Sequence, residues 1–466
     1  MRRKILAVLL ASAMVVSLAG CGGSSDSGSS GGSSGAAADS GAAADSGSTD
    51  TAAADSGSSD TAAADTAAGG NSLTVWAWDA NFNIPALQAA ADDYKANVDS
   101  SFELNIVEQS GSEDIENAIT LAGSAGDYST LPDIVLFQDH WIQRYVSDYP
   151  DAFLSANDAD VDWSDFSQEK LSYSTINGEH YGFPVDNGTV IFAYRVDLLE
   201  QCGYSIDDMT GISWDEFIAI GEEVYAQTGK YLLSMDGSGN DLVYMMLQAE
   251  GVSQFKDGKP YITENQALVE VVNVIVEMAQ KNVLYLANDW GDYTDQTIIG
   301  DMVAGVMNGN WIIPTISQVS ENSGKWEVTS LPTLKGGEGY ASNGGSSLYI
   351  TAGCQNPDLA KAFLAYTFGG SSVTYDAALK NGGVITTCIS AGESAVYNEG
   401  VAYFNDTPVY AQIVEMGAGV PIVEQSDYHY TCRNYIGAAI INIINGSDTM
   451  AELQGAEDQL NFEMGN

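Results

Sequence analysis

Aromatic and polar side chains come directly after two segments that have the pattern of β-strands. Residues 73–78 alternate and are rich in β-forming side chains, and they end in Trp78, which Asp79 follows. Gln138 and Asp139 follow a short apolar run. Carboxylates and amides pair well with hydroxyl groups, and aromatic rings stack on apolar C–H faces. These residues therefore predict a binding site for a small polyhydroxylated molecule.

Further candidates of the same types lie later in the chain. The additional candidate ligand-binding residues are Asp186, Asn187, Trp290, Asn310, Trp311, Asn343, Gly344, Gly345, Tyr428 and Arg433. Trp311 is the strongest candidate for a stacking platform, and the two adjacent glycines allow backbone amides to approach a ligand closely. Arg433 is one of few cations, and its planar guanidinium can pair with hydroxyls or with a carboxylate. For each of these residues the alternative is a structural role in core packing, a turn or a helix cap.

The motifs of common enzyme classes are missing from the sequence. There is no GxSxG, HExxH, P-loop or GxGxxG motif in a suitable strand–helix context. Pairs of carboxylates suited to a glycosidase carry no weight, because 63 acidic residues make coincidental pairs certain. The three histidines, His140, His180 and His429, lie near no second soft metal ligand in sequence. We therefore expect a protein that is not an enzyme and that needs neither a cofactor nor a metal ion.

The chain is strongly acidic, with 63 Asp and Glu residues against 16 Lys and Arg residues and a net charge of −47. This charge argues against nucleic acid as a partner, because its phosphates would be repelled, and against direct binding to anionic lipid headgroups. Most of these carboxylates are expected to form a solvated surface that keeps the protein soluble. They leave open a cationic ligand, such as a polyamine, as an alternative to a polyhydroxylated one.

The first 70 residues are not expected to belong to the folded body. Three basic residues at 2–4 and an apolar stretch at 5–16, too short to span a bilayer comfortably, predict a secretory signal peptide over residues 1–20. The small residues before Cys21 resemble the lipobox of bacterial lipoproteins, which implies cleavage before Cys21, lipidation of its thiol and anchoring to the membrane. An ordinary signal peptide followed by a stray cysteine is the alternative. Residues 21–70 are small or acidic and cannot bury much surface, so they predict a disordered tether.

The rest of the chain alternates between strand and helix patterns. Predicted strands are at 73–78, 102–107, 133–137 and 189–194, and predicted helices are at 84–96, 112–122, 213–224, 263–275 and 357–368, with capping boxes at 213–216 and 263–266. Such alternation indicates parallel sheets that are covered by helices. The roughly 400 residues after the tether are more than a single typical core contains, so two α/β lobes are expected. The four further cysteines, which allow three disulfide pairings or free thiols, are Cys202, Cys354, Cys388 and Cys432.

Several short motifs occur in an order and spacing that resemble a known family. The motifs are Leu131-Pro-Asp-Ile-Val-Leu-Phe-Gln-Asp139, Tyr181-Gly-Phe-Pro-Val-Asp-Asn187 with Tyr194-Arg-Val-Asp197, Met307-Asn-Gly-Asn-Trp311 and Gly344-Gly-Ser-Ser347. They resemble, in turn, a strand followed by a binding loop, a crossover between lobes, a segment that delivers a ring-stacking tryptophan, and the return to the first lobe. Residues 72–466 therefore resemble the maltose-binding-like family of carbohydrate solute-binding proteins. That family commonly has Asn-Lys where this chain has Arg195-Val196.

The resemblance implies an α/β fold of the type II periplasmic-binding-protein kind, with two lobes that each contain a helix-covered, mostly parallel sheet. It places lobe 1 at 71–184 plus 327–370 and lobe 2 at 185–326 plus 371–466, with three crossovers between them. Ligands of open α/β sheets bind beyond the carboxyl ends of the strands, so the site is expected in the cleft between the lobes.

The implied function is that of the solute-binding component of an ABC importer, lipid-anchored at the extracytoplasmic face of the cell membrane. Such a protein would be a monomer, capture a sugar or an oligosaccharide by hinge closure, and pass it to the transmembrane permease subunits. Three alternatives stay open at this point: a binding protein for another polar solute such as a polyamine or a peptide, a surface glycoside hydrolase or adhesin, and a structural lipoprotein without a small ligand.

Overall fold

The structure is a computed structural model in which residues 70–186, 188–237 and 239–465 are described. The predicted signal peptide, the candidate lipidation site Cys21, nearly all of the predicted tether and the candidate ligand-binding residue Asn187 lie outside the described residues. Among the described helices, none has both the length and the apolar character that a membrane crossing needs.

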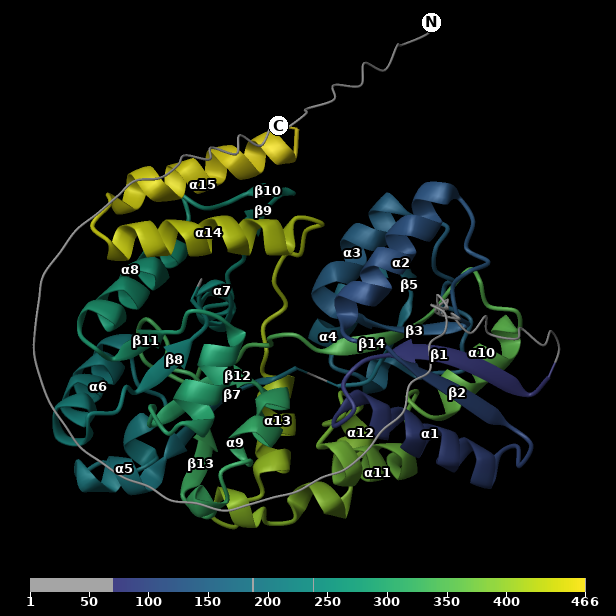
Figure 1. The fold of residues 1–466 in the computed structure, drawn as a ribbon, viewed down its shortest axis with the longest axis horizontal. Helices are drawn as coiled ribbons and strands as arrows, with labels where there is room; N and C mark the ends of the chain where they lie inside the picture. The colour runs from purple at the N-terminus through teal and green to yellow at the C-terminus, as the bar shows by residue number, and fades with distance from the viewer. Residues whose placement is uncertain (1–69, 187, 238, 466) are drawn as a thin grey trace, which may run out of the picture. The chain divides into compact units, whose positions relative to one another are not determined.

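Five strands in the order β2-β1-β3-β14-β6 form the first sheet, and Figure 1 labels the first four of them. They are β1 (Ser72–Ala77), β2 (Glu103–Glu108), β3 (Ile134–Gln138), β6 (Gly182–Pro184) and β14 (Ser346–Ile350). β1 runs parallel to β2 and β3, whereas β14 runs antiparallel to both β3 and β6. The observed bounds of β1, β2 and β3 each differ by one residue from the predicted ranges. Alternation and apolar runs show that a strand is present, but they do not define its first and last residues.

Both faces of the first sheet are buried, which explains the unbroken apolar run of β3. Leu136 packs on one face with Phe363, while Val135 and Phe137 pack on the other face with Ile142. A strand that is covered on both sides needs apolar residues at every position rather than at alternate ones. The helices around this sheet are α1 (Asn83–Asn97), α2 (Ser112–Ala125), α3 (Asp139–Asp148), α4 (Gln168–Tyr173), α10 (Pro357–Tyr366), α11 (Ser372–Gly382) and α12 (Ile389–Gly392).

The second sheet has three antiparallel strands in the order β12-β7-β13, with a separate parallel pair of β11 and β8 beside it. The strands are β7 (Val190–Arg195), β8 (Leu233–Met235), β11 (Leu284–Leu286), β12 (Gly305–Gly309) and β13 (Trp326–Thr329). The prediction of a mostly parallel sheet is therefore wrong for this half of the molecule. Side-chain periodicity locates a strand, but it carries no information on the direction in which the chain re-enters the sheet.

Helices surround the second sheet and the parallel pair, and the last two of them, α14 and α15, lie side by side (Figure 1). The helices of this half are α5 (Val196–Gln201), α6 (Trp214–Thr228), α7 (Asn240–Ala249), α8 (Gln266–Gln280), the π-helix η3 (Asp292–Ile299), α9 (Ile313–Ile316), α13 (Val409–Ala418), α14 (His429–Ile444) and α15 (Thr449–Glu463). The remaining short elements are η1 (Trp163–Asp165), β4 (Thr175–Ile176), β5 (Glu179–His180), η2 (Asp207–Met209), β9 (Phe255–Lys256), β10 (Lys259–Pro260), η4 (Asn310–Ile312), η5 (Ser320–Asn322), η6 (Ala395–Asn398) and η7 (Ala402–Phe404).

The division between the two halves differs from the predicted one at two places. β13 pairs with β7 of the second sheet, although the prediction assigned residues from 327 onward to lobe 1. Tyr375 and Ala378 of α11 pack in the core of the first sheet, although the prediction assigned residues from 371 onward to lobe 2. We therefore propose that lobe 1 contains the first sheet with α1–α4 and α10–α12, and that lobe 2 contains the remaining strands β7–β13 and helices α5–α9 and α13–α15.

Helix caps follow the predicted signals in part. Ser213 and Glu216 form both hydrogen bonds of a capping box at the start of α6. The box predicted at 263–266 does not form, because the Asn265 side chain accepts the hydrogen bond from Leu268 N and caps α8 instead. The Thr263 hydroxyl donates to Glu457 of α15, so a tertiary contact replaces the local one. Cys202, Cys354, Cys388 and Cys432 are all free thiols.

Candidate ligand-binding site

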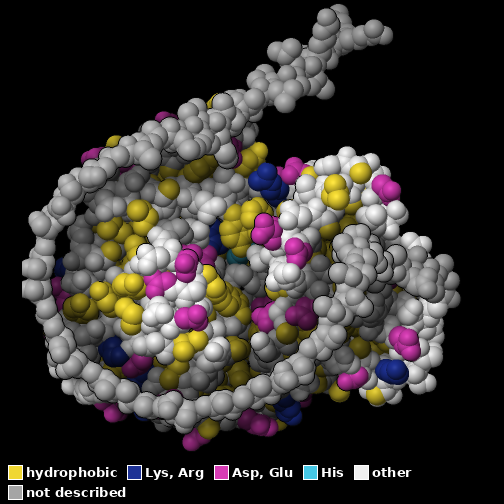
Figure 2. Space-filling view, in the orientation of Figure 1, with side chains coloured by type: hydrophobic (Ala, Val, Ile, Leu, Met, Phe, Trp, Pro, Cys, Tyr) yellow, Lys and Arg dark blue, Asp and Glu magenta, His cyan; other side chains and the backbone are white. Residues whose placement is uncertain are grey.

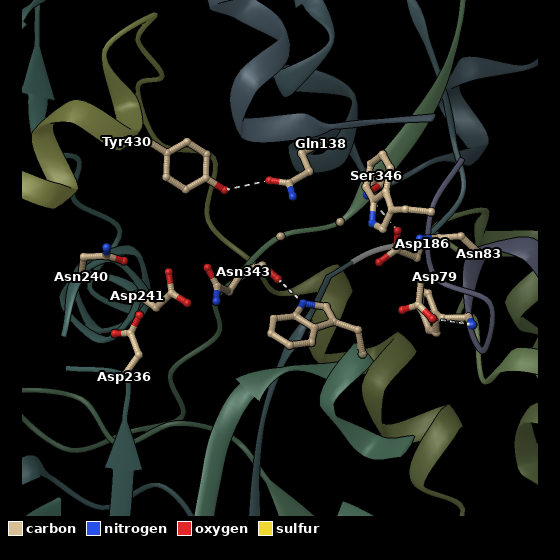
Figure 3. A pocket seen from close by; sticks show the side chains of 15 residues that line it. Asp79, Asn83, Gln138, Asp186, Asp236, Asn240, Asp241, Asn343, Ser346 and Tyr430 are labelled. Atoms are coloured by element: carbon tan, nitrogen blue, oxygen red, sulfur yellow. Dashed lines mark hydrogen bonds between the residues drawn. The ribbon is translucent and has the colours of Figure 1, made fainter. Parts of the chain in front are cut away.

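A cavity of about 450 Å³ lies between the two lobes. Its lining residues are Trp78, Asp79, Phe82, Asn83, Gln138, Asp186, Asp236, Asn240, Asp241, Trp311, Asn343, Gly344, Gly345, Ser346 and Tyr430. Figure 3 shows Asp79, Asn83 and Asp186 on one side, Asp236, Asn240 and Asp241 on the opposite side, and Asn343 between them. Trp78 follows β1 and Asp236 follows β8, so the cavity lies at strand ends, where open α/β sheets bind ligands.

The structure brings eight of the predicted ligand-binding residues together around this cavity. They are Trp78, Asp79, Gln138, Asp186, Trp311, Asn343, Gly344 and Gly345. The predicted residues that do not line it are Asp139, Trp290, Asn310, Tyr428 and Arg433. The following paragraphs describe where these five residues lie.

The lobe 1 side of the cavity is held in place by local hydrogen bonds. Asp79 adopts a positive φ of 68°, and its Oδ1 accepts hydrogen bonds from the backbone N–H groups of Asn81 at 3.0 Å and Phe82 at 3.1 Å. This turn links β1 to α1 and leaves the Asp79 side chain exposed. Gln138 donates to Ser112 Oγ at 3.2 Å and accepts from the Tyr430 hydroxyl at 3.4 Å, so its amide has a defined orientation (Figure 3).

Trp311 is a fixed platform on the lobe 2 side. Its Nε1 donates to the Asn343 carbonyl at 2.8 Å, and the Asn343 amide donates to Asn308 Oδ1 at 2.9 Å. A Cβ atom at Gly309 would lie 2.2 Å from Trp311 Nε1, and one at Gly344 would lie 3.0 Å from the same atom. These glycines therefore make room for the edge of the indole, and the hydrogen bond fixes the direction in which its face points.

A buried charged layer lies directly behind the cavity, and Asp139 belongs to it. Asp139 is fully buried in an ion pair with Lys170, and it accepts a hydrogen bond from Ser347 Oγ at 2.7 Å. Lys170 Nζ also donates to the Ser346 carbonyl at 3.1 Å, and Ser346 N donates to Asp186 Oδ1 at 2.8 Å. Burial raises the pKa of Asp139 and of Asp186, and the nearby Lys170 ammonium opposes that rise. Asp139 thus positions the crossover segment instead of facing the cavity.

Arg433 has the same supporting role on the lobe 2 side. Its guanidinium is completely buried and pairs with Asp241, which faces the cavity. It lies over the rings of Tyr244 and Tyr430, with a centroid distance of 4.9 Å in each case, and donates to Asn343 Oδ1 at 3.4 Å. Burial lowers the pKa of Arg433 to about 9, although the charge of Asp236 opposes this shift. The arginine therefore orients a cavity carboxylate and does not itself reach the cavity.

The other three predicted residues lie at the margin. The Trp290 ring lies 5.7 Å from the Trp311 ring, and Trp290 is 45 % exposed. Asn310 is buried, and neither atom of its amide has a hydrogen-bond partner among the described residues. Tyr428 donates to the Glu463 carbonyl at 3.3 Å, and it precedes by two residues Tyr430, which lines the cavity.

Several lining residues were not predicted from the sequence. They are Phe82, Asn83, Asp236, Asn240, Asp241, Ser346 and Tyr430. Asp236 follows β8, which is too short for a reliable strand signal, and Asn240 and Asp241 open the helix after it. The signal that was available is the run of small and polar residues at 236–241, which is typical of a loop after a strand.

The two lobes also touch through aromatic rings beside the cavity. The imidazoles of His140 from α3 and His429 from α14 stack with centroids 4.5 Å apart and planes 10° apart. Trp141 and Tyr430 stack in the same way at 4.5 Å and 27°. Burial lowers the pKa of both histidines, that of His429 to about 3, and the charges of Arg433 and Lys170 add to the effect at His140. Both imidazoles are therefore neutral where the lobes meet.

Comparison with known proteins identifies the family of this chain. A family model described as bacterial extracellular solute-binding protein matches residues 89–405. The chain belongs to this family. The lactose-binding protein of Rhizobium radiobacter is 31 % identical over 397 residues, which cover 84 % of this chain and 93 % of that protein. The arabinooligosaccharide-binding protein of Bacillus subtilis (strain 168) is 24 % identical over 311 residues, which cover 65 % of this chain and 70 % of that protein.

Solved structures confirm the fold class that the resemblance implied. The ABC transporter associated binding protein from B. animalis subsp. lactis Bl-04, solved in complex with β-1,6-galactobiose, matches with a TM-score of 0.68 and 20 % sequence identity. The match covers 85 % of this chain and 98 % of that chain. This solute-binding protein therefore has the two-lobed type II fold of periplasmic binding proteins.

Proposed function

We propose that this solute-binding protein captures a sugar or an oligosaccharide in the cavity between its lobes and supplies it to an ABC importer. The observation that carries the proposal is the composition of the cavity, where Trp78 from lobe 1 and Trp311 from lobe 2 accompany carboxylates and amides from both lobes. Indole faces bind the C–H faces of sugar rings, and carboxylates and amides bind their hydroxyls. The similarity to the lactose-binding and arabinooligosaccharide-binding proteins supports this ligand class.

Capture takes place by closure of the two lobes around the ligand. A sugar that contacts both Asp79 of lobe 1 and Asp241 of lobe 2 makes its full set of hydrogen bonds only when the lobes are close together. Binding therefore favours the closed arrangement by the difference in contacts between the two states. No step of this cycle breaks a covalent bond, so the protein acts as a binding protein rather than as an enzyme.

The proposal also includes a lipid anchor and a membrane permease as the partner. Lipidation of Cys21 would hold the protein at the extracytoplasmic face of the cell membrane, and residues 21–70 would let the folded body move above it. The face in Figure 2 carries many acidic and few basic side chains, which suits a body that stays away from anionic headgroups. A single monomer would dock on the transmembrane permease subunits.

Isothermal titration calorimetry of the purified protein tests the proposal. The probes are lactose, β-1,6-galactobiose and arabinotriose, and we expect saturable binding of at least one of them with one site per chain. The same sugar is recovered intact after hours of incubation if the protein is a binder, whereas cleavage products indicate a glycoside hydrolase. Absence of binding by every sugar contradicts the proposal.

The carboxylates in the cavity support a second candidate, a cationic solute such as a polyamine. Asp79, Asp186, Asp236 and Asp241 all line the cavity, and no lysine or arginine is among its described lining residues. A cation bound by these charges would lose affinity steeply as salt rises, because salt screens charges that water can reach. Titration with spermidine at low and high salt distinguishes this ligand from a neutral sugar, whose affinity should hardly change.

A further inference from the structure

A second hollow, of about 470 Å³, adjoins the cavity on lobe 2. Asp236 lines both spaces, and Asn288, Asp289 and Ile441 are among the residues that line only the second one. Figure 3 shows Asp236 at the lobe 2 end of the first cavity, away from Asp79 and Asp186. The two spaces therefore lie on either side of, or next to, the same carboxylate.

The second hollow lies at the ends of two neighbouring parallel strands. β8 and β11 pair in register, with Met235 opposite Leu286, so Asp236 and Ala287 leave the sheet side by side. A Cβ atom at Gly237 would lie only 2.4 Å from the Ala287 carbonyl, so glycine allows the two loops to meet. Carboxyl ends of adjacent parallel strands are where α/β sheets place ligands, and this edge has the same geometry as the edge at the first cavity.

The polar side chains of the second hollow are held in position. Asn288 donates to Asp292 Oδ2 from its backbone N at 2.9 Å and from its side chain at 2.8 Å. The backbone N of Asp292 donates to Asp289 Oδ1 at 2.8 Å. These bonds tie the loop to the first turn of η3. A loop held in this way offers amide and carboxylate groups to a ligand with little loss of conformational entropy.

Trp290 is an exposed indole that lines neither space but has a neighbour in each. Trp290 follows Asp289 of the second hollow, and its ring lies 5.7 Å from that of Trp311 in the first cavity. The buried Tyr293 supports it from behind, with ring centroids 5.0 Å apart. Trp290 nevertheless stays 45 % exposed. A partly exposed indole beside a polar loop has the chemistry that stacks on a sugar ring.

We propose that Trp290 and the second hollow form an additional subsite, so that the preferred ligand is an oligosaccharide longer than a disaccharide. Trp78 and Trp311 provide two platforms in the first cavity, one for each of two sugar units, and Trp290 provides a third. Asn288 and Asp289 bind hydroxyls of the third unit. The inference rests on the proposed function, because it names the length of the ligand that the same site takes.

A length series measured by calorimetry tests the subsite. The probes are galactose, lactose and a galactosyl-lactose trisaccharide, with arabinose to arabinotetraose as a parallel series, and the variants are Trp290→Ala and, as a control for loss of an exposed aromatic, Phe462→Ala. Phe462 is 84 % exposed and belongs to α15, outside both spaces. We expect the wild-type trisaccharide to bind about tenfold more tightly than the disaccharide, which corresponds to one stacked ring.

Trp290→Ala should remove most of that gain, weakening the trisaccharide about tenfold and the disaccharide less than threefold, while Phe462→Ala changes neither. The disaccharide affinity and the melting temperature of each variant report whether the fold is intact. Equal wild-type affinity for disaccharide and trisaccharide, or equal weakening of both by Trp290→Ala, overturns the subsite and leaves the proposed function standing. If neither series binds to the wild type, the proposed function and the subsite are both wrong.

Discussion

The cavity wall and the layer behind it use the same residue types in opposite ways. Gln138 faces the cavity, where its amide has partners from both lobes, while the next residue, Asp139, is buried in an ion pair with Lys170. The same contrast separates Asp241, which faces the cavity, from Arg433, which lies behind it without exposure. From this comparison we propose that the wall binds the ligand, whereas the buried layer contributes to the free energy of unfolding and to the way the lobes meet.

Loss of the lysine in the buried layer should have the largest effect. Lys170→Met leaves Asp139 and Asp186 buried without a cation, and breaking a buried pair in this way costs about 3–5 kcal/mol in the free energy of unfolding. Chemical denaturation monitored by circular dichroism measures it. Lys281→Met is the matched control, since its pairs with Glu222 and Glu277 lie on the surface and should contribute little. Equal stability of the two variants would contradict a supporting role for the layer.

Removal of the Trp311 indole should affect ligand binding at the cavity wall and not the buried layer behind it. Trp311→Ala is expected to lower sugar affinity about 30-fold or more, because a central aromatic contact typically contributes about 2 kcal/mol or more to binding. The loss in unfolding free energy should be clearly smaller than for Lys170→Met. Calorimetry and denaturation of the same preparation give both numbers. If the Trp311→Ala variant unfolds easily but binds sugar normally when folded, Trp311 belongs to the supporting layer and not to the ligand-binding wall.

The histidine pair predicts a pH dependence of binding. Its neutral stack joins the lobes, and burial lowers the pKa of both rings, so the closed state binds fewer protons than an open state in which the rings meet water. The stabilisation is complete above the ordinary pKa of 6.5 and is lost as the pH falls below it toward the value of about 3 for His429. Sugar affinity should fall below pH 6.5 by up to about tenfold per pH unit for each ring that opens to water.

The groups around the pair and a control histidine make this prediction specific. The side chains that face the two rings are Lys170 and Tyr173 from α4, Tyr244 from α7, and Tyr430 and Arg433 from α14. His429→Gln should reduce the slope of affinity against pH. His180→Gln should leave the slope unchanged, although burial lowers the pKa of His180 to about 4, because this ring packs on Trp163 inside lobe 1. Affinity that is constant between pH 8 and 5 would show that the stack does not open.

The smallest expected effect is a difference in sugar affinity between substitutions of two neighbouring tyrosines. Tyr430 lines the cavity and bonds to Gln138, whereas Tyr428 points to the end of α15. We expect Tyr430→Ala to weaken sugar binding about tenfold and Tyr428→Ala to change it less than twofold, in line with the usual gap between a central and a peripheral contact. Calorimetry with one disaccharide compares them. The reverse order would mean that the ligand lies nearer to the start of α14 than the cavity suggests.

Much of lobe 1 was predictable from the sequence, because its strands are long and are followed by recognisable loops. The ends of β1 and β3 point directly to Trp78, Asp79 and Gln138, which all line the cavity. Lobe 2 was predictable only in part. Its strand β8 has three residues, so neither the strand nor Asp236 after it stands out from the surrounding polar sequence.

Whether a polar side chain faces the cavity or lies buried behind it was not predictable at several positions. The pattern around Asp139 is the same whether the carboxylate faces a ligand or a lysine, and its partner Lys170 is 31 residues away in sequence. Arg433 raises the same difficulty, since its burial depends on Asp241 and on aromatic rings from other helices. Tertiary packing decides which polar residues support the site and which ones touch the ligand.

A crystal structure with the tightest-binding oligosaccharide tests the central claim most directly. The account predicts sugar rings against Trp78 and Trp311, with hydroxyls bonded to Asp79 from lobe 1 and to Asp241 from lobe 2. Sugar that contacts one lobe only, or that lies outside the space between them, would contradict it.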